Sequence, residues 1–149
     1  MEQHIYEVGL EYLTQRKGLM TAPEVDAPLE VATPPQFPGG MEGIWSPEHL
    51  FTSAVLSCFM TTFLAIAENS KLPFRSFTCK AQGKLEKVEG KYMMSAVHLL
   101  PVLQLEDEAL TEKAKRILAK AEEHCLISNS IKSSVTMEAS VIIAEEIPA

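Results

Sequence analysis

The spacing of hydrophobic residues changes along the chain and divides it into segments with different predicted structures. Apolar and polar residues mix over residues 5–13, and Arg16-Lys17-Gly18 is typical of a turn, so this stretch predicts a hairpin of short strands. Proline and glycine then recur up to Trp45, which predicts a loop through Phe37-Pro38-Gly39-Gly40. Strands and loops, rather than helices, are therefore expected before Trp45.

A long helix is predicted from Ser46 to about Asn69. Ser46 can cap it, Pro47 suits the first helical position, and the Glu48 carboxylate suits the positive end of the helix dipole. Residues 50–67 carry no charge, which reaches the minimum length of a membrane span. Hydroxyl side chains recur in this stretch and no basic residue lies close before it, so a buried central helix is favoured over a membrane helix.

Alternating and helical periods then follow one another. Apolar residues alternate with polar ones at positions 77, 79, 81 and 85, and Glu89-Gly90 turns this strand into a second one over 91–103, which predicts an antiparallel hairpin. Spacings of three and four predict a surface helix over 107–124, and alternation returns over 134–143 as a last strand. This order predicts an α+β fold with mainly antiparallel sheet, in a single domain over 1–149.

Composition and charge narrow the possible functions. The 149 residues are 46% hydrophobic and 22% charged, as in a soluble globular domain with its own core. The formal net charge is −7 and long basic blocks are absent, so a nucleic-acid partner is not expected. Glu2, His4 and Glu7 interrupt the first ten residues, which argues against a targeting segment and for a cytoplasmic location.

The three cysteines indicate a reducing compartment. Cys58, Cys79 and Cys125 are odd in number and widely spaced, which argues against a disulfide framework. Cys79 lies on the predicted core face of its strand and is interpreted as packing. Cys58 on the long helix and Cys125 at the end of the second helix can face the same core, but the sequence does not fix their distance. For Cys58, packing in a buried helix remains an equal alternative to chemistry.

A reactive Cys58 needs a source of positive charge to stabilise its thiolate. It lies about 18 Å from the helix start, beyond the reach of the helix dipole. The chain has three arginines, and Arg16, in an early turn, can fold over the site, whereas Arg75 and Arg116 are interpreted as surface charges. The histidine and cysteine spacings do not fit a metal site, and a Cys-His hydrolase arrangement or nucleotide-binding motif is not recognisable.

Two segments resemble a known protein family. Trp45-Ser46-Pro47-Glu48-His49-Leu50-Phe51, followed by Ser57-Cys58-Phe59, resembles the "N-P-E-x-L-F … C-F" signature of the OsmC/Ohr family of osmotically induced and organic hydroperoxide resistance proteins. Residues 121–129, around Cys125, resemble the second-cysteine segment of that family. The family's usual Cys-Pro is replaced here by Cys125-Leu126, and its Gly-rich arginine turn by Thr14-Gln15-Arg16-Lys17-Gly18.

The resemblance implies a thiol peroxidase in the OsmC-like fold, an intertwined homodimer with antiparallel sheets packed on a long central helix. It assigns Cys58 as the peroxidatic cysteine, Cys125 as the resolving cysteine, and Arg16 and Glu48 as active-site residues. The implied substrates are an organic hydroperoxide and a dithiol reductant, with no metal or other cofactor. Neighbouring phenylalanines would favour organic over hydrogen peroxide; they are Phe51, Phe59 and Phe63.

Two alternatives remain at the level of sequence. The first is a non-enzymatic dimer that binds an apolar ligand or partner and uses its cysteines only for packing. The second is a thioesterase-like fold wrapped around a helix, which is disfavoured because a substrate-facing carboxylate or histidine is not evident. Helix geometry adds one condition to the peroxidase: Glu48 and Cys58 lie about 15 Å apart along one helix, so a shared site needs the glutamate of a second chain.

Overall fold

The computed structural model describes residues 2–144 and divides into two compact units. The N-terminal unit runs to Leu50 and the C-terminal unit begins at Phe51. Residue 1 and residues 145–149, the ends of the predicted domain 1–149, lie outside the described residues.

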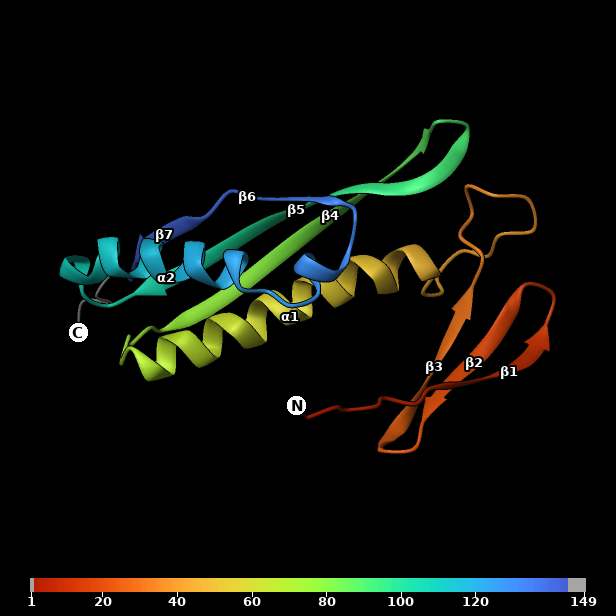
Figure 1. Cartoon of the computed structure of the whole chain (residues 1–149), viewed down its shortest axis with the longest axis horizontal. Helices are drawn as coiled ribbons and strands as arrows, with labels where there is room; N and C mark the ends of the chain where they lie inside the picture. Colours follow the sequence, from red (N-terminus) through yellow and green to blue (C-terminus); the bar gives the residue numbers. More distant parts are fainter. Residues whose placement is uncertain (1, 145–149) are drawn as a thin grey trace, which may run out of the picture. The chain divides into compact units, whose positions relative to one another are not determined.

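The N-terminal unit contains a three-stranded antiparallel sheet in the order β1-β2-β3 (Figure 1). The strands are β1 (Gly9–Thr14), β2 (Lys17–Ala22) and β3 (Val25–Ala32). The predicted hairpin is confirmed as β1-β2, whereas β3 was missed because Pro28, with Pro23 before the strand and Pro34 after it, predicted a loop. Pro28 is tolerated because β3 is an edge strand and this residue lies at an irregularity of its pairing with β2.

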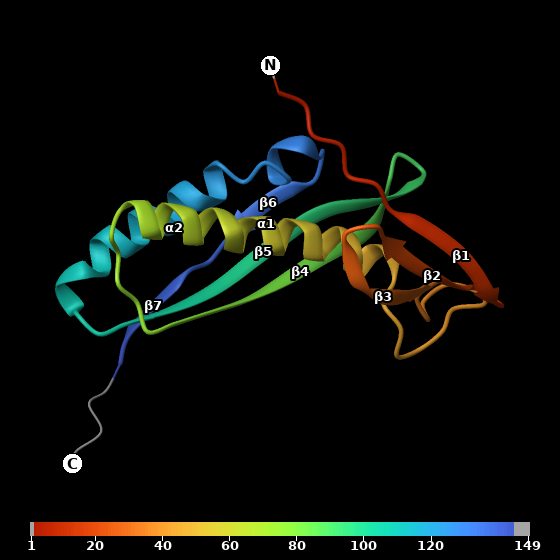
Figure 2. The same cartoon turned by 90° about the horizontal axis from the view of Figure 1, so that it is seen from below.

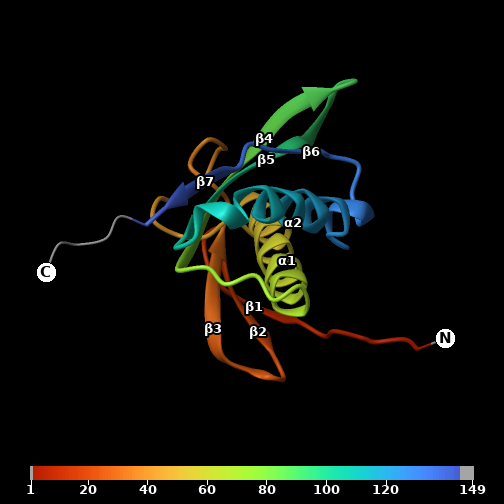
Figure 3. The same ribbon diagram turned by 90° about the vertical axis from the view of Figure 1, so that its left-hand side faces the viewer.

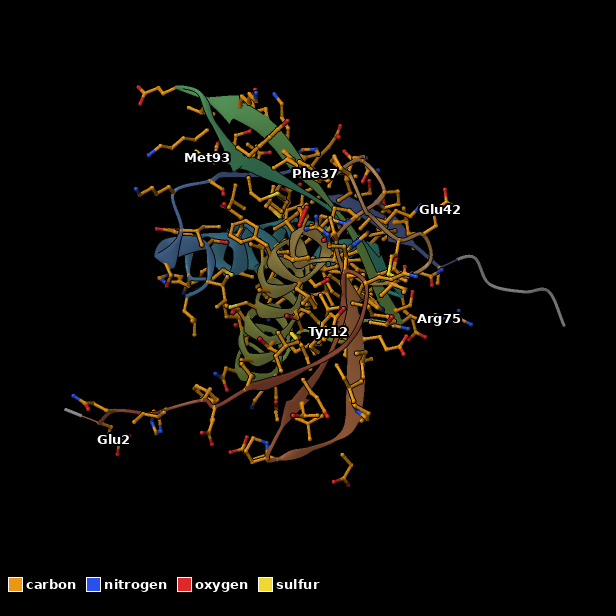
Figure 4. All side chains as sticks on the ribbon, turned by 90° about the vertical axis from the view of Figure 1, so that its right-hand side faces the viewer. Glu2, Tyr12, Phe37, Glu42, Arg75 and Met93 are labelled. Carbon is orange, nitrogen blue, oxygen red and sulfur yellow. The ribbon has the colours of Figure 1, made fainter. Side chains whose placement is uncertain are left out.

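The predicted loop before the helix is confirmed and is closed by its own backbone. Phe37 N–H donates to the Pro34 carbonyl (3.1 Å), and Met41 N–H donates to the Thr33 carbonyl (2.9 Å). Figure 4 shows the side chains of Phe37 and Glu42 on this loop. The loop then delivers the chain to the helix start, where Ala32 N–H donates to the Trp45 carbonyl (2.8 Å).

The long helix α1 (Pro47–Asn69) begins where the sequence predicts. Ser46 is fully buried, and its hydroxyl accepts a hydrogen bond from the His49 N–H (3.2 Å). In return, the Ser46 N–H donates to His49 Nδ1 (3.1 Å). This is a capping box in which a histidine ring nitrogen takes the place of the usual glutamate or glutamine.

The C-terminal unit is built on a long hairpin with two short strands beside it. The strands β4 (Ser76–Val88) and β5 (Lys91–Leu105) pair antiparallel, as predicted. The predicted last strand divides into β6 (Ser134–Met137) and β7 (Ser140–Ile143), and both pair parallel with β5. Alternation of apolar residues does not report strand direction, so the parallel pairing could not be predicted.

A β-bulge changes the predicted face of one residue in β4. Phe77, Cys79 and Ala81 pack against the core as expected. The pairing with β5 shifts between Lys84 and Leu85, and Leu85 is 36% exposed instead of joining that face.

Two helices cover the same face of the β4-β5 sheet (Figures 1 and 3). They are α1, from Phe51 on, and α2 (Thr111–Glu123), which follows the short 3₁₀ turn η1 (Glu108–Leu110). Phe63 of α1 stacks on Phe77 of β4 with 4.6 Å between ring centroids. Both helices and β5 supply the fully buried core side chains, which include Val55, Phe59, Phe63, Val97, Leu99, Leu103, Leu105, Ala114, Leu118 and Ala121.

Helix α1 buries only one of its faces within this chain. Figure 2 shows it running alongside α2 and the hairpin, and its buried residues are Val55, Phe59, Phe63 and Ala67. Met60 and Leu64 are each 39% exposed. By length and composition α1 is apolar enough to cross a membrane, with 22% of its most apolar window buried. The expected buried central helix is thus found on one face only, and the other face is partly exposed.

Candidate active site

Cys58 and Cys125 meet at the edge of the C-terminal core. Cys58 lies on α1 at the border of its buried face. Cys125 directly follows His124, the C-cap residue of α2. Cys125 is fully buried, and its thiol interacts with the Cys58 sulfur and with the Val55 carbonyl 4.0 Å away. The expectation that the two cysteines face the same core is therefore confirmed. Both are free thiols in this structure.

The turn after Cys125 directs backbone N–H groups at Cys58. The carbonyl of Cys125 accepts from Asn129 N–H (3.1 Å), and the carbonyl of Leu126 accepts from the Ser130 hydroxyl (2.7 Å). The C=O and the N–H of one trans peptide point in opposite directions. The N–H groups of Leu126 and Ile127 therefore point away from the donors to these carbonyls, and they donate to the Cys58 sulfur. The turn continues into the 3₁₀ segment η2 (Ser128–Ser130).

These donors favour the thiolate form of Cys58. Burial raises the pKa of Cys58, but hydrogen bonds from Ile127 N–H, the Cys125 thiol, the Thr62 hydroxyl and Leu126 N–H outweigh it. The Thr62 oxygen lies 3.9 Å from the sulfur, one helical turn further along α1. The net result is a pKa of Cys58 below the usual thiol value, which is the property required of a nucleophilic cysteine.

The pKa of Cys125 is shifted in the opposite direction, above the usual thiol value. Burial raises the pKa of Cys125, the hydroxyl and N–H of Ser128 lower it, and the neighbouring Cys58 raises it further. These opposite directions favour a pair in which Cys58 carries the negative charge and Cys125 keeps its proton.

Cys79 provides a comparison within the same unit. Burial raises the pKa of Cys79, and a hydrogen bond from the Leu100 N–H offsets only part of this effect. It lies on the core-facing side of β4 beside Phe77, as the sequence predicts for a packing residue. A hollow of about 290 Å³ borders it on the side of Met60.

Arg16 lies in the β1-β2 turn of the N-terminal unit. Its carbonyl accepts from Thr33 N–H (3.3 Å), which ties the turn to the loop after β3. Its side chain rests against the backbone of Gly39, whose φ of +81° favours glycine and where a Cβ would meet the Arg16 Cγ and Nε at 3.1 Å. Arg16 borders a mainly apolar surface hollow of about 430 Å³, together with Leu10, Tyr12, Met20 and Pro47.

Glu48 lies in the first turn of α1 and is half-buried, as expected for a carboxylate at a helix start. Arg16 and Glu48 both belong to the N-terminal unit, and the cysteines to the C-terminal unit. The structure brings Cys58 and Cys125 together, whereas the meeting of Arg16 and Glu48 with Cys58 stays a prediction.

The structure adds residues to the site that the sequence did not reveal and removes others. Phe59 and Phe63 are fully buried in the core, so they do not border Cys58 as a substrate surface, contrary to expectation. Thr62 was missed, although its position four residues after Cys58 on a helix was a usable signal. The amides of Leu126 and Ile127 and the hydroxyl of Ser128 depend on the turn conformation. One usable signal was that Leu126 has the N–H that the family's proline lacks.

Residues 2–144 contain no group of three or more histidine, cysteine or acidic side chains arranged to hold a metal ion.

Comparison with known proteins agrees with the fold. The family model described as "OsmC-like protein" matches residues 39–140, a span that contains Glu48, Cys58 and Cys125. The chain belongs to the OsmC-like protein family. An uncharacterized protein of Bacillus subtilis, YmaD, is 23% identical over 151 residues, which cover 98% of this chain and 100% of that protein.

Solved structures of OsmC-like proteins share this fold. An OsmC-like protein of unknown function from Vibrio cholerae has a TM-score of 0.81 at 23% identity, covering 92% of this chain and 99% of that one. An organic hydroperoxide resistance protein from Legionella pneumophila has a TM-score of 0.73 at 22% identity, covering 95% and 99%. The protein OhrB of Bacillus subtilis, also named for organic hydroperoxide resistance, has a TM-score of 0.67 at 18% identity, covering 93% and 98%. The α+β OsmC-like fold expected from the sequence is confirmed.

Proposed function

We propose that this OsmC-like protein is a cysteine-based peroxidase that reduces organic hydroperoxides, with Cys58 as the peroxidatic and Cys125 as the resolving cysteine. The observation that carries the proposal is the contact between two thiols whose pKa values are shifted in opposite directions. Packing alone does not require donors from two separate segments, the turn at residues 125–127 and helix α1, to converge on one sulfur. Some structural relatives are named for organic hydroperoxide resistance, which supports the same activity.

The proposed reaction begins with the Cys58 thiolate. It attacks the terminal oxygen of the hydroperoxide, so that an S–O bond forms, the O–O bond breaks, and the alkoxide leaves and takes a proton to become an alcohol. Cys58 is now a sulfenic acid. The Cys125 sulfur then attacks the Cys58 sulfur, a disulfide forms, and the hydroxide that leaves is protonated to water. An external dithiol restores both thiols by exchange and is itself oxidised.

The preference for organic hydroperoxides follows from apolar surface near the proposed substrate-binding residues. The hollow beside Arg16 is lined largely by apolar side chains, so an alkyl group bound there would leave water while the guanidinium faces the peroxide oxygens. Leu126, directly after Cys125, is 65% exposed and offers a second apolar contact. These residues replace Phe59 and Phe63 as the proposed source of selectivity.

The proposed active form is an intertwined homodimer. Every residue of β1 is exposed, including Leu10 and Tyr12, each 71% exposed, and Figure 4 shows the Tyr12 side chain on this strand. The outer face of α1 is also partly apolar and exposed. Exposed apolar side chains grouped on a strand and on a helix face are typical of a protein interface. In the proposed dimer, Arg16 and Glu48 of one chain complete the site of Cys58 in the other, with the Glu48 carboxylate orienting the guanidinium.

The proposed cycle needs thiols that are regenerated after each turnover. A dithiol reductant and a reducing compartment supply that condition, which agrees with the expected cytoplasmic location.

The test of this proposal is the disulfide that forms when the reduced protein is treated with one equivalent of an organic hydroperoxide. Peptide mapping should find Cys58 linked to Cys125 within one chain, with Cys79 still free. Links to Cys79, or three unmodified thiols after the hydroperoxide has been added, would instead support a binding protein whose cysteines only pack.

A further inference from the structure

The Ser128 hydroxyl is an unsatisfied polar group at the edge of the cysteine pair. Among residues 2–144 it is the buried side-chain oxygen or nitrogen that lacks a hydrogen bond of ordinary geometry. Neighbouring hydroxyls are satisfied: Ser130, two residues later, donates to the Leu126 carbonyl at 2.7 Å. Because leaving a buried hydroxyl unpaired costs free energy, Ser128 is expected to have a role in another state of the site.

The atom on which Ser128 acts is the Cys125 sulfur. Both the hydroxyl and the backbone N–H of Ser128 stabilise negative charge on this sulfur. The turn that presents them is fixed by the hydrogen bond from Asn129 N–H to the Cys125 carbonyl. While the sulfur is a neutral thiol, this hydroxyl lies outside ordinary hydrogen-bond geometry. Once the sulfur becomes an anion, the hydroxyl can form a shorter and stronger hydrogen bond to it.

The charge state of Cys58 decides when that happens. Within residues 51–144, the Cys58 thiolate is the charged group that affects Cys125, and its negative charge opposes ionisation of the Cys125 thiol. When a hydroperoxide converts Cys58 into a neutral sulfenic acid, this opposition ends, and the thiol of Cys125 no longer has a thiolate to which it can donate. The donors of Ser128 remain in place.

We propose that Ser128 is a positioning residue for the second, disulfide-forming step, in which it orients and stabilises the Cys125 thiolate after Cys58 has been oxidised. This inference rests on the peroxidase function proposed above. In that step the Cys125 thiol releases its proton and its sulfur attacks the Cys58 sulfur. The S–S bond forms as the S–O bond breaks, and the departing hydroxide becomes water with the released proton. Ser128 keeps its own proton throughout and acts only as a donor.

The first experiment needs no peroxide and uses the Cys58→Ser variant, in which an uncharged group stands next to Cys125 as it does after oxidation. Alkylation of Cys125 is followed against pH by peptide mapping, which separates it from Cys79. Cys125 should react at lower pH in Cys58→Ser than in the wild-type protein. Adding Ser128→Ala should slow its alkylation about tenfold at a pH below the pKa of Cys125, because less thiolate is present. An unchanged pH profile after adding Ser128→Ala overturns the proposal.

The second experiment separates the two chemical steps by rapid mixing of the reduced protein with a hydroperoxide. Ser128→Ala should leave the rate of Cys58 oxidation unaltered and slow disulfide formation about tenfold. Ser128→Thr, which keeps the hydroxyl, should restore the second step, and Ser134→Ala, an exposed serine on β6, serves as the matched control. Equal slowing of both steps would indicate a general structural defect and overturn the proposal.

The two experiments also separate this inference from the function on which it rests. If the wild-type protein consumes no hydroperoxide but Ser128→Ala still shifts the Cys125 profile, the peroxidase function is overturned and the step assigned to Ser128 falls with it. If hydroperoxide is consumed and the profile does not move, the function stands and only the role of Ser128 is overturned.

Discussion

Cys58 is stabilised as a thiolate by neutral donors within its own unit. Two backbone amides, one hydroxyl and one thiol converge on its sulfur, and together they outweigh the effect of burial. From the sequence, a cation was expected to stabilise this thiolate, because the helix dipole does not reach this depth. The structure supplies another solution in the turn after Cys125. In the proposed dimer, Arg16 would further stabilise a Cys58 thiolate that these neutral donors already favour.

The contribution of one of these donors can be measured with Thr62→Val. The substitution keeps the shape of the side chain but removes the hydroxyl 3.9 Å from the sulfur, so the pKa of Cys58 should rise. Alkylation of Cys58 at a pH below its pKa should then slow roughly three- to tenfold and recover at higher pH.

The neighbouring residue offers a matched control for this measurement. The Thr61 hydroxyl donates to the Cys58 carbonyl rather than to the sulfur, so Thr61→Val should leave the pH profile of Cys58 in place. Equal profiles for wild type and Thr62→Val would contradict the role of Thr62. In all these proteins Cys79 should reach its maximum rate only at higher pH, because burial raises the pKa of Cys79.

The residues of the site were predictable to different degrees. Cys58 and Cys125 could be found from their positions on apolar helix faces and from the family resemblance. Leu126 and Ile127 act through a turn whose backbone directs N–H groups at a sulfur 68 and 69 positions away in sequence, with donors that any non-proline residue can supply. Side-chain identity does not encode such contacts.

At the scale of elements, local signals located the helices well and the strands less completely. The start of α1 followed from Ser46 and Pro47, which act through their nearest neighbours. The strand β3 pairs with its neighbour β2 and was missed because of its proline, whereas the parallel direction of β6 and β7 depends on pairing with the distant β5. Leu85 left its predicted face because of a bulge, which is also a property of the strand pair and not of one strand.

The capping box at the start of α1 leads to a stability prediction. His49→Ala removes the ring nitrogen that accepts from Ser46 N–H, and should lower the free energy of unfolding by about 1 kcal/mol. His49→Gln keeps an acceptor at this position and should retain most of the stability. Denaturant unfolding of both variants beside the wild type measures the difference. If the Ala variant equals both the wild type and the Gln variant in stability, His49 does not stabilise the helix start.

At the scale of the whole molecule, the proposed assembly with a second chain would cover exposed apolar residues of each unit. The sequence predicted this from helix geometry and family resemblance, since Glu48 and Cys58 are about 15 Å apart on one helix. The structure adds the apolar surfaces that a dimer would cover, on β1 and on the outer face of α1.

Complementation between two inactive variants tests whether the site is shared. Glu48→Ala and Cys58→Ser are each expected to lose activity, but a heterodimer of the two contains one site with both Glu48 and Cys58 intact. Co-expression with two different affinity tags isolates that heterodimer, and it should regain about half of the activity of the wild-type dimer. Isolated heterodimers without activity would show that each site is formed within one chain or does not use Glu48.

The central claim, that Cys58 reduces hydroperoxides and Cys125 resolves the product, is tested most directly by counting hydroperoxide molecules consumed per chain. With a panel of dithiol reductants, the wild-type protein should turn over many times with at least one of them, and Cys58→Ser should not turn over at all. Without a reductant, Cys125→Ser should rapidly consume one equivalent and leave a sulfenic acid on Cys58, which excess hydroperoxide can oxidise further. Consumption by Cys58→Ser at the wild-type rate, or none by the wild type with any dithiol, would contradict the account.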